Sequence, residues 1–309
     1  MRTVKPISKF DKRQATKIAG LLVTTILLFG ACEKQVSINL GSSPPIVVVQ
    51  GQIQTGNPPV VMLTTTISFF SNINLATLES TFIHKAVVTV YDGSRTITLK
   101  EYALDTGANS KFYFYSIDTA NLSNIMLGET GKFYTLKIVS NGNTYTSVTK
   151  IPNPKGIDSM WFGKPVYTNK NTPDSAFEIY VNYTDPDTPG NYVRTFTKRN
   201  SEPYYADGLF SDQVVNGLVI KNIDLYAGYL DSVNVKVDTL MYFYPGDTVT
   251  LNWCQIDKGV YDFWNTEIYA NRAQGNPFAS PINVKTNIEG GAIGIWAGYS
   301  NSFTTKIVP

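Results

Sequence analysis

The chain has 309 residues, a length that suggests about two domains. Its formal charge of +2 is unevenly distributed, because six of the 26 Lys and Arg residues but only one of the 24 acidic residues lie in the first 17 positions. The remainder carries 20 bases and 23 acids, a net charge of −3. This balance excludes a basic field for nucleic acid or anionic lipid.

The N-terminal segment is typical of an export signal. Its six basic residues precede an uncharged, mostly apolar run from Ile18 to Ala31, which is shorter than the roughly 20 residues of a membrane-spanning helix. The run ends in Phe29-Gly30-Ala31-Cys32, which resembles a lipobox, in which small residues precede a cysteine that is acylated. We therefore expect a signal peptide at residues 1–31, a lipid anchor such as palmitate on Cys32, and location at the outer membrane of the cell envelope. Exposure at the cell surface is left open.

The first part of the body is predicted to be a β-sandwich. After a tether at residues 32–45, which ends in Pro44-Pro45, β-branched runs separated by turn residues predict short strands. Asp-Gly and Asn-Gly pairs between such runs predict hairpins with type I′ turns at Asp92-Gly93 and Asn141-Gly142. The spacing that leads to Tyr134 resembles a tyrosine corner. We predict an immunoglobulin-like domain over residues 46–152, with strands at residues 46–53, 60–67, 85–91, 94–99, 111–117, 132–140 and 144–150.

Prolines at positions 152 and 154 mark the predicted domain boundary, so residues 153–309 form a second β-rich domain. Strands are predicted at residues 176–183, 191–199, 214–220, 233–244 and 247–256. The hydrophobic period then changes to that of a helix, with apolar residues Val260, Phe263, Trp264 and Ile268 on one face. This helix is predicted over about residues 258–272 and should stop near Gly275-Asn276-Pro277.

The residues that usually carry catalysis or bind metals are scarce. Cys254 is the second of two cysteines and lies in an apolar run, so we expect a buried, inert thiol. His84 is the only histidine and has no nucleophile motif near it, so we expect it at the surface. One free cysteine and one histidine are too few for a zinc site. The stretch from Asp185 to Gly190 faintly resembles a calcium loop, but its prolines favour a turn. No cofactor, metal or catalytic residue is predicted.

Aromatic residues are abundant and mostly fill the cores of β-proteins. Tyr204 and Tyr205 differ, because they lie in the polar stretch Asn200–Asp212, which is predicted to be irregular. Aromatic side chains on an exposed loop suit stacking on sugars or peptides, or a protein interface. The alternative is a loop folded back on its own sheet. We name Tyr204 and Tyr205 as the expected interaction loop.

Several segments resemble one family of envelope lipoproteins, domain of unknown function 4249 (DUF4249) of Bacteroidota. The most specific are GNPFASP at residues 275–281 and NIEGGAIG at residues 287–294. Further similar segments are VVVQGQI at 47–53, AVVTVYDG at 86–93, the hairpin at 132–151, DTPGNY at 187–192, GDTV at 246–249 and AGYS at 297–300. The resemblance implies a lipoprotein often encoded beside a TonB-dependent outer-membrane receptor, and it carries no catalytic residues.

Three functions follow as expectations. The first is a non-enzymatic binding or assembly accessory to a TonB-dependent receptor. The second is a glycan-active hydrolase, which needs two carboxylates in a cleft. The third is a purely structural envelope protein. A pocket with paired acids and aromatic residues favours the hydrolase, whereas a broad apolar patch favours the accessory role.

Overall fold

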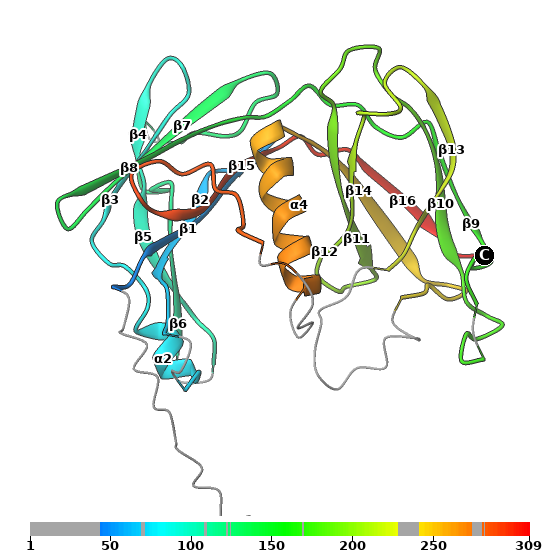
Figure 1. The fold of residues 1–309 in the computed structure, drawn as a ribbon, viewed down its shortest axis with the longest axis horizontal. Coiled ribbons are helices and arrows are strands. Elements are labelled where there is room, and N and C mark those ends of the chain that lie inside the picture. Colours follow the sequence, from blue (N-terminus) through cyan, green and yellow to red (C-terminus); the bar gives the residue numbers. More distant parts are fainter. Residues whose placement is uncertain are drawn as a thin grey trace, which may run out of the picture. The chain divides into compact units, whose positions relative to one another are not determined.

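The structure is a computed structural model that describes residues 44–309, apart from residues 69–71, 108–109, 122, 124, 169, 228–240, 274–279 and 281. Cys32, the predicted signal peptide and nearly all of the predicted tether lie outside the described residues. Figure 1 shows strands throughout the described chain and one long helix late in it. The prediction of an all-β fold is confirmed.

The strands of the first sandwich form two sheets. One sheet has the order β15-β1-β2-β6-β5 and the other β4-β3-β7-β8. Without β15, this is the arrangement of an immunoglobulin-like domain, in which strands A, B, E and D face strands C′, C, F and G. The strands are β1 (Val47–Gln54), β2 (Val60–Thr65), β3 (Val87–Tyr91), β4 (Thr96–Thr98), β5 (Lys100–Asp105), β6 (Lys111–Ser116), β7 (Phe133–Ser140) and β8 (Asn143–Lys150). A short helix, α2 (Leu75–Glu79), follows β2.

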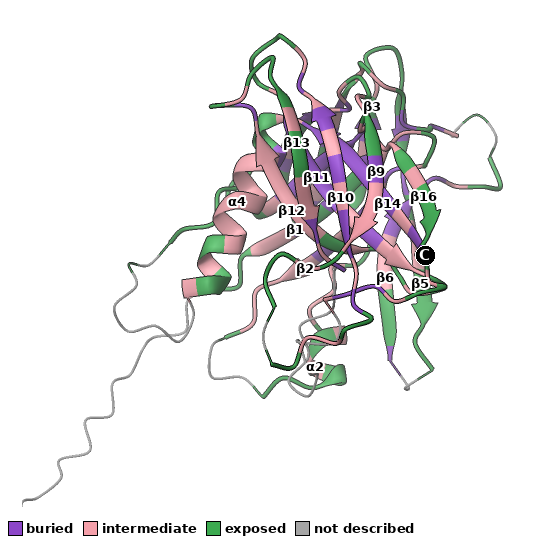
Figure 2. Ribbon diagram, turned by 90° about the vertical axis from the view of Figure 1, so that its right-hand side faces the viewer, coloured by how far each residue is buried: buried purple, intermediate pink, exposed green. Residues whose placement is uncertain are grey.

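Alternate residues of the two sheets point inward and form one apolar core, because side chains of a strand alternate between its faces. Val49 and Leu63 come from the first sheet, and Val90 and Leu136 from the second. The predicted tyrosine corner is present, since the backbone N–H of Glu129 donates to the Tyr134 hydroxyl at 2.7 Å. In Figure 2 the buried residues lie mainly on the strands, and α2 has none.

Both predicted hairpins form. Asn141 and Gly142 have φ of 48° and 77°, as a type I′ turn requires. The type I′ turn predicted at Asp92-Gly93 is wrong, because only Gly93 has positive φ there, at 94°. Asp92 instead accepts the backbone N–H groups of Ser94 and Arg95, at 2.9 Å each, and so shapes a longer turn. The side chain of Asp92, the first residue of the turn, therefore determines the turn type.

Two further sheets form a second sandwich, with orders β13-β10-β9 and β12-β11-β14-β16. Its core includes Ile179 and Val181 from the first sheet and Leu251 and Trp253 from the second. The strands are β9 (Ser159–Gly163), β10 (Glu178–Thr184), β11 (Tyr192–Arg199), β12 (Tyr205–Ser211), β13 (Val219–Leu225), β14 (Thr248–Ile256) and β16 (Phe303–Ile307).

The late helix is confirmed as α4 (Lys258–Ala273). Asp257 accepts the backbone N–H of Val260 at 2.9 Å, which is the bond of an N-cap. Its other carboxylate oxygen accepts the Lys150 N–H at 2.9 Å, so the start of α4 is tied to β8. The predicted stop near Gly275-Asn276-Pro277 lies outside the described residues. No helix among the described residues has the length and apolarity needed to cross a membrane.

Strand β15 (Ile293–Tyr299) comes late in the chain but belongs to the first sandwich. It pairs in parallel with β1, from Val48 opposite Ile293 to Gln54 opposite Tyr299. Trp296 projects from β15 into the first core, where its indole N–H donates to the backbone carbonyl of Tyr134 at 2.9 Å. The other face of β15 packs with α4 and β14 in a third apolar cluster. The domain boundary at residues 152–153 stays a prediction.

Some predicted elements need correction. The stretch Asn200–Asp212 is not irregular, because residues 205–211 form β12 and pair with β11. The strand predicted at residues 214–220 begins at Val219 and continues to Leu225. Most of the strand predicted at residues 233–244 lies outside the described residues, and its last four residues are not in a strand.

Candidate functional site: an uncharged groove beside helix α4

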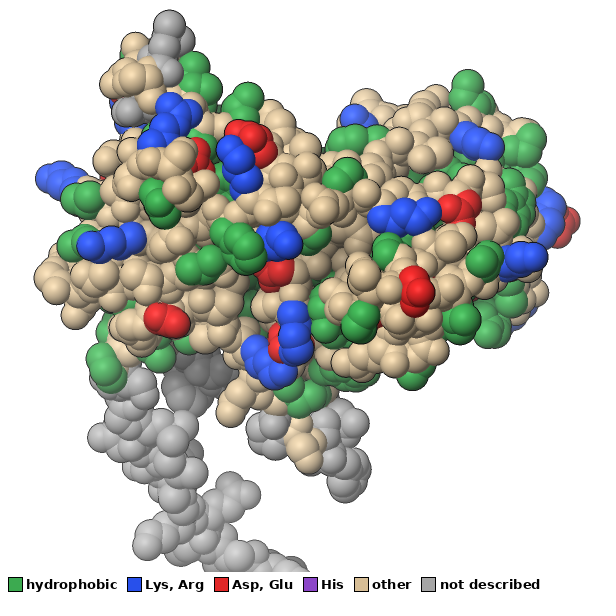
Figure 3. All heavy atoms as spheres, turned by 90° about the horizontal axis from the view of Figure 1, so that it is seen from above, with side chains coloured by type: hydrophobic (Ala, Val, Ile, Leu, Met, Phe, Trp, Pro, Cys, Tyr) green, Lys and Arg blue, Asp and Glu red, His purple; other side chains and the backbone are tan. Residues whose placement is uncertain are grey.

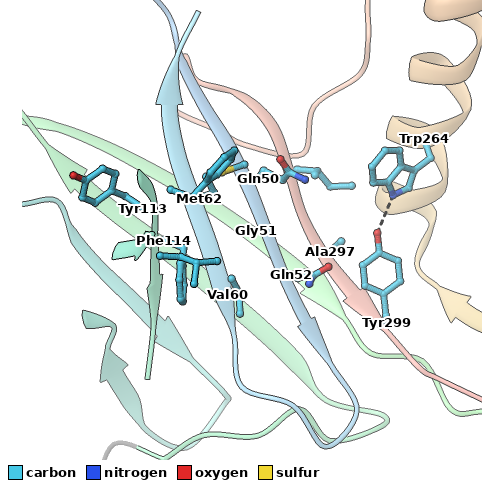
Figure 4. A pocket seen from close by; sticks show the side chains of 13 residues that line it. Gln50, Gly51, Gln52, Val60, Met62, Tyr113, Phe114, Trp264, Ala297 and Tyr299 are labelled. Carbon is cyan, nitrogen blue, oxygen red and sulfur yellow. Dashed lines mark hydrogen bonds between the residues drawn. The ribbon is translucent and has the colours of Figure 1, made fainter. Parts of the chain in front are cut away.

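A groove of about 310 Å³ lies between the outer face of the five-stranded sheet and helix α4. Figure 4 shows side chains of β1, β2 and β6 on one side, and Trp264 of α4 together with Tyr299 of β15 on the other. Its lining residues are Gln50, Gly51, Gln52, Val60, Met62, Leu104, Phe112, Tyr113, Phe114, Trp264, Ile295, Ala297 and Tyr299.

The alternation of strand side chains explains this lining. On β1, Val49 and Ile53 enter the core, so Gln50 and Gln52 point to the opposite face. On β15, Trp296 enters the core, so the alternate residues Ile295, Ala297 and Tyr299 point to the groove side. Register places Ala297 opposite Gln52.

The lining carries no Asp, Glu, Lys, Arg or His. Gln50 and Gln52 are exposed, and neither side-chain amide has a hydrogen-bond partner within the part of the chain that the structure describes. On the face drawn in Figure 3, basic and acidic side chains are interspersed, without a large field of one sign. The groove therefore offers apolar contact and two neutral amides.

Trp264 is held on several sides. Its indole N–H donates to the hydroxyl of Tyr299 at 2.9 Å, as the dashed line in Figure 4 marks. The guanidinium carbon of Arg194 lies 3.5 Å from the centre of its ring. Phe263 meets it edge to face, with ring centres 4.9 Å apart. These contacts fix the orientation of the indole before any ligand arrives.

Arg194 of β11 is a buried cation with unusual surroundings. The residue is only 8% exposed, and its Nε and Nη1 have no hydrogen-bond partner among the described residues. Burial lowers the pKa of the guanidinium, and burial likewise raises the pKa of the neighbouring Tyr299 to about 12. A buried charge without a partner is costly. The aromatic faces of Trp264 and Phe196, 3.5 and 5.4 Å away, supply cation–π contact instead.

A second cavity, of about 410 Å³, opens at the edge of the second sandwich. Asp185 and Asp212 line it together with aromatic rings that include Phe210 and Trp253. Both carboxylates are buried. Burial and the negative charge of Asp212 raise the pKa of Asp185, against the opposing effect of the Gly217 N–H. This is the combination expected for the hydrolase alternative.

The bonds of these two acids also give them a structural role. One oxygen of Asp212 accepts the backbone N–H groups of Gly190 and Asn191, at 2.7 and 2.9 Å. Asp185 accepts the N–H of Gly217 at 3.2 Å. Each acid thus closes a loop beside the cavity. No group of three His, Cys, Asp or Glu side chains suited to a metal occurs in the described residues.

Neither Tyr204 nor Tyr205, the expected interaction residues, lines the groove. Tyr204 is 43% exposed, contacts the ring of Phe303 with centres 6.0 Å apart, and lines a small neighbouring hollow. Tyr205 is half-buried at the start of β12, where it pairs with Thr197. Their role in an interface stays a prediction.

The predictions that Cys254 is buried and that His84 lies at the surface are confirmed. Cys254 is buried, with 1% of its surface exposed, and burial raises the pKa of its thiol well above the ordinary range. His84 is exposed and pairs with Glu101. Sequence patterns did not identify the groove, because it depends on β15 lying beside β1. The alternation of Gln50 and Gln52 with Val49, Gly51 and Ile53 was the one available signal.

In a comparison with protein families, the family model described as "Domain of unknown function (DUF4249)" matches residues 33–305. No curated protein matches the sequence.

Proposed function

Because the chain belongs to the DUF4249 family, we propose that it is a lipid-anchored envelope protein of Bacteroidota that serves a TonB-dependent outer-membrane receptor as a non-enzymatic binding accessory. One observation carries this proposal: the lining of the open groove beside α4 is mostly apolar and contains no Asp, Glu, His, Lys, Cys, Ser or Thr, which are the side chains that most often transfer protons or attack a substrate. Such a groove suits holding a ligand without changing it.

A lipid anchor would favour binding to a membrane receptor. Acyl chains on Cys32 confine the body to the membrane surface, and confinement raises its effective concentration near a membrane partner. A weak interface is then sufficient for occupancy. Tyr204 is a candidate for this contact, because it is exposed and does not line the groove.

The test is co-purification of the tagged, full-length protein from crosslinked and solubilised envelopes of its own cells. We expect a TonB-dependent receptor to be enriched with the wild type. The Cys32→Ala variant is the control, and it should lose the receptor because it leaves the membrane. If no receptor is enriched even after crosslinking, the accessory role is wrong.

The hydrolase remains a second candidate because of the acid pair beside aromatic rings in the second cavity. Asp185 would donate the proton, since its pKa is raised, and Asp212 would be the second carboxyl group of the pair. Release of reducing sugar from an oligosaccharide panel tests this role. Activity that is lost in Asp185→Asn would replace the accessory role with the enzyme.

A further inference from the structure

The fixed orientation of Trp264 limits what it can offer a ligand. Its only N–H is already bonded to Tyr299 at 2.9 Å, and the guanidinium of Arg194 covers one face of its ring at 3.5 Å. A ligand in the groove can therefore meet only the opposite face or an edge of the indole. That surface makes apolar and C–H contacts, and it is preorganised, which reduces the entropy lost on binding.

The floor of the groove offers a different chemistry beside this ring. Gln50 and Gln52 project from alternate positions of β1, and Figure 4 shows both between Trp264 and the side chains of β2. Each amide provides a donor and an acceptor. Neither amide is bonded to any described residue, so both are free to bond a ligand.

The absence of charged side chains from the lining limits the kinds of ligand that the groove can bind. A charged ligand would lose hydration on entering a lining without any ionised side chain, and nothing there would compensate the loss. The matching ligand is uncharged, with an apolar face and an edge of groups that both donate and accept. A sugar ring has this combination, since its C–H groups form faces and its hydroxyl groups form the edge.

We propose that the groove binds a neutral carbohydrate, with one sugar ring stacked on Trp264 and its hydroxyl groups bonded to Gln50 and Gln52. This inference rests on the proposed function and names the ligand class that the accessory protein holds. Arg194 is a positioning residue in this site. Its enclosed Nε and Nη1 do not reach the ligand, and its guanidinium keeps the indole plane in place.

The test is isothermal titration of the detergent-solubilised, full-length protein with maltoheptaose, cellohexaose, xylohexaose and laminarihexaose. We expect at least one of these neutral oligosaccharides to bind. Trp264→Ala should weaken that binding about tenfold or more, and Trp264→Phe by less, because a ring is retained. The double variant Gln50→Ala/Gln52→Ala should weaken it severalfold. The control is Trp161→Ala, which removes a ring stacked on Tyr180 outside the groove and should leave the affinity unchanged.

A separate variant tests the role of Arg194. Arg194→Met should weaken oligosaccharide binding severalfold without lowering the thermal unfolding temperature, because removal of an unpaired buried cation offsets the lost ring contact. A merely structural role would lower the unfolding temperature and leave the affinity of the folded protein intact. That pattern would contradict positioning by Arg194.

Three results would overturn the carbohydrate inference: no binding of any of the four oligosaccharides at millimolar concentration, unchanged affinity in Trp264→Ala, or tighter Trp264-dependent binding of trigalacturonate or of an uncharged apolar hexapeptide. Receptor co-purification separates this failure from failure of the proposed function. A receptor that still follows the protein leaves the accessory role standing with another ligand.

Discussion

At the scale of single residues, buried polar groups identify the positions where this protein departs from an ordinary β-sandwich. Arg194 is one such group, and the carboxyl group of Asp207 on β12 is another. Asp207 as a whole is half-buried, but its Oδ2 is enclosed and has no hydrogen-bond partner among the described residues. Burial, together with the charges of Asp224 and Glu178, raises the pKa of Asp207 to about 7, although the Tyr226 N–H opposes this rise.

The raised pKa of Asp207 predicts how stability depends on pH. The unfolded chain releases this proton near pH 4, whereas the folded protein keeps it until about pH 7. The folded state therefore binds more protons in this window, and its stability falls as pH rises from about 4 to 7. Asp207→Asn stays neutral, so its free energy of unfolding should exceed that of the wild type by about 4 kcal/mol at pH 8, but not at pH 4.

Urea unfolding of both proteins at several pH values measures this difference. Glu129→Gln is the control, because Glu129 is exposed and its ion pair with Lys132 lies at the surface. Its difference from wild type should stay small throughout. If the curves of Asp207→Asn and wild type run parallel between pH 4 and 8, the assignment to Asp207 is wrong.

The thiol of Cys254 gives a second prediction for a single residue. Its sulfur is buried beside Asn301, with the Sγ–Oδ1 distance at 3.1 Å, and the raised pKa keeps it protonated. Only the thiolate reacts rapidly with thiol reagents. A chromogenic disulfide reagent should therefore modify Cys254 only after denaturation. Labelling of the folded protein within minutes would show that the strand opens or that the thiol is accessible.

At the scale of elements, strand β15 joins segments that are far apart in the sequence. Gly298 makes this possible, because a Cβ atom there would lie 2.3 Å from the carbonyl oxygen of Lys150 on β8. The Gly298 N–H also donates to the Thr149 hydroxyl at 2.8 Å. We predict that Gly298→Ala forces β15 and β8 apart and lowers the free energy of unfolding by about 1–3 kcal/mol.

Chemical denaturation followed by tryptophan fluorescence measures this loss, since Trp296 lies on β15. The matched control is Gly156→Ala, where the nearest atom to an added Cβ is 3.6 Å away, on Ser302. This control should change stability by no more than about 0.5 kcal/mol. Equal stability of Gly298→Ala and wild type would mean that β15 tolerates displacement.

Elements held together by nearby residues were predictable from the sequence. The hairpin at Asn141-Gly142 and the helix that carries Val260 and Trp264 depend on local turn chemistry and hydrophobic period, and both were predicted. The parallel pairing of β15 with β1 joins residues about 245 positions apart in sequence, as Val48 opposite Ile293 shows. No local pattern encodes such a pairing. The groove was missed for the same reason, because its two walls meet only after β15 is in place.

At the scale of the whole molecule, the proposed lipid anchor would determine where in the cell the groove meets its ligand. Acylation of Cys32 would contribute roughly 0.8 kcal/mol for each CH₂ group buried in the membrane, and stable attachment takes two chains or more. The anchor would therefore retain the entire body at the membrane, although none of the described helices could cross it. The prediction follows from Gly30-Ala31-Cys32 after an apolar run, a segment outside the described residues.

We predict that cells expressing the wild-type protein incorporate labelled palmitate into it, and that Cys32→Ala abolishes both the label and sedimentation with membranes. Cys254→Ala is the matched control, because it removes the other cysteine of the chain, which is buried and far from the N-terminus in sequence. It should be labelled like the wild type. Equal labelling of wild type and Cys32→Ala, or no label in the wild type, would refute the anchor. Without the anchor, confinement near a membrane receptor would no longer support the accessory role, whereas carbohydrate binding in the groove would be unaffected.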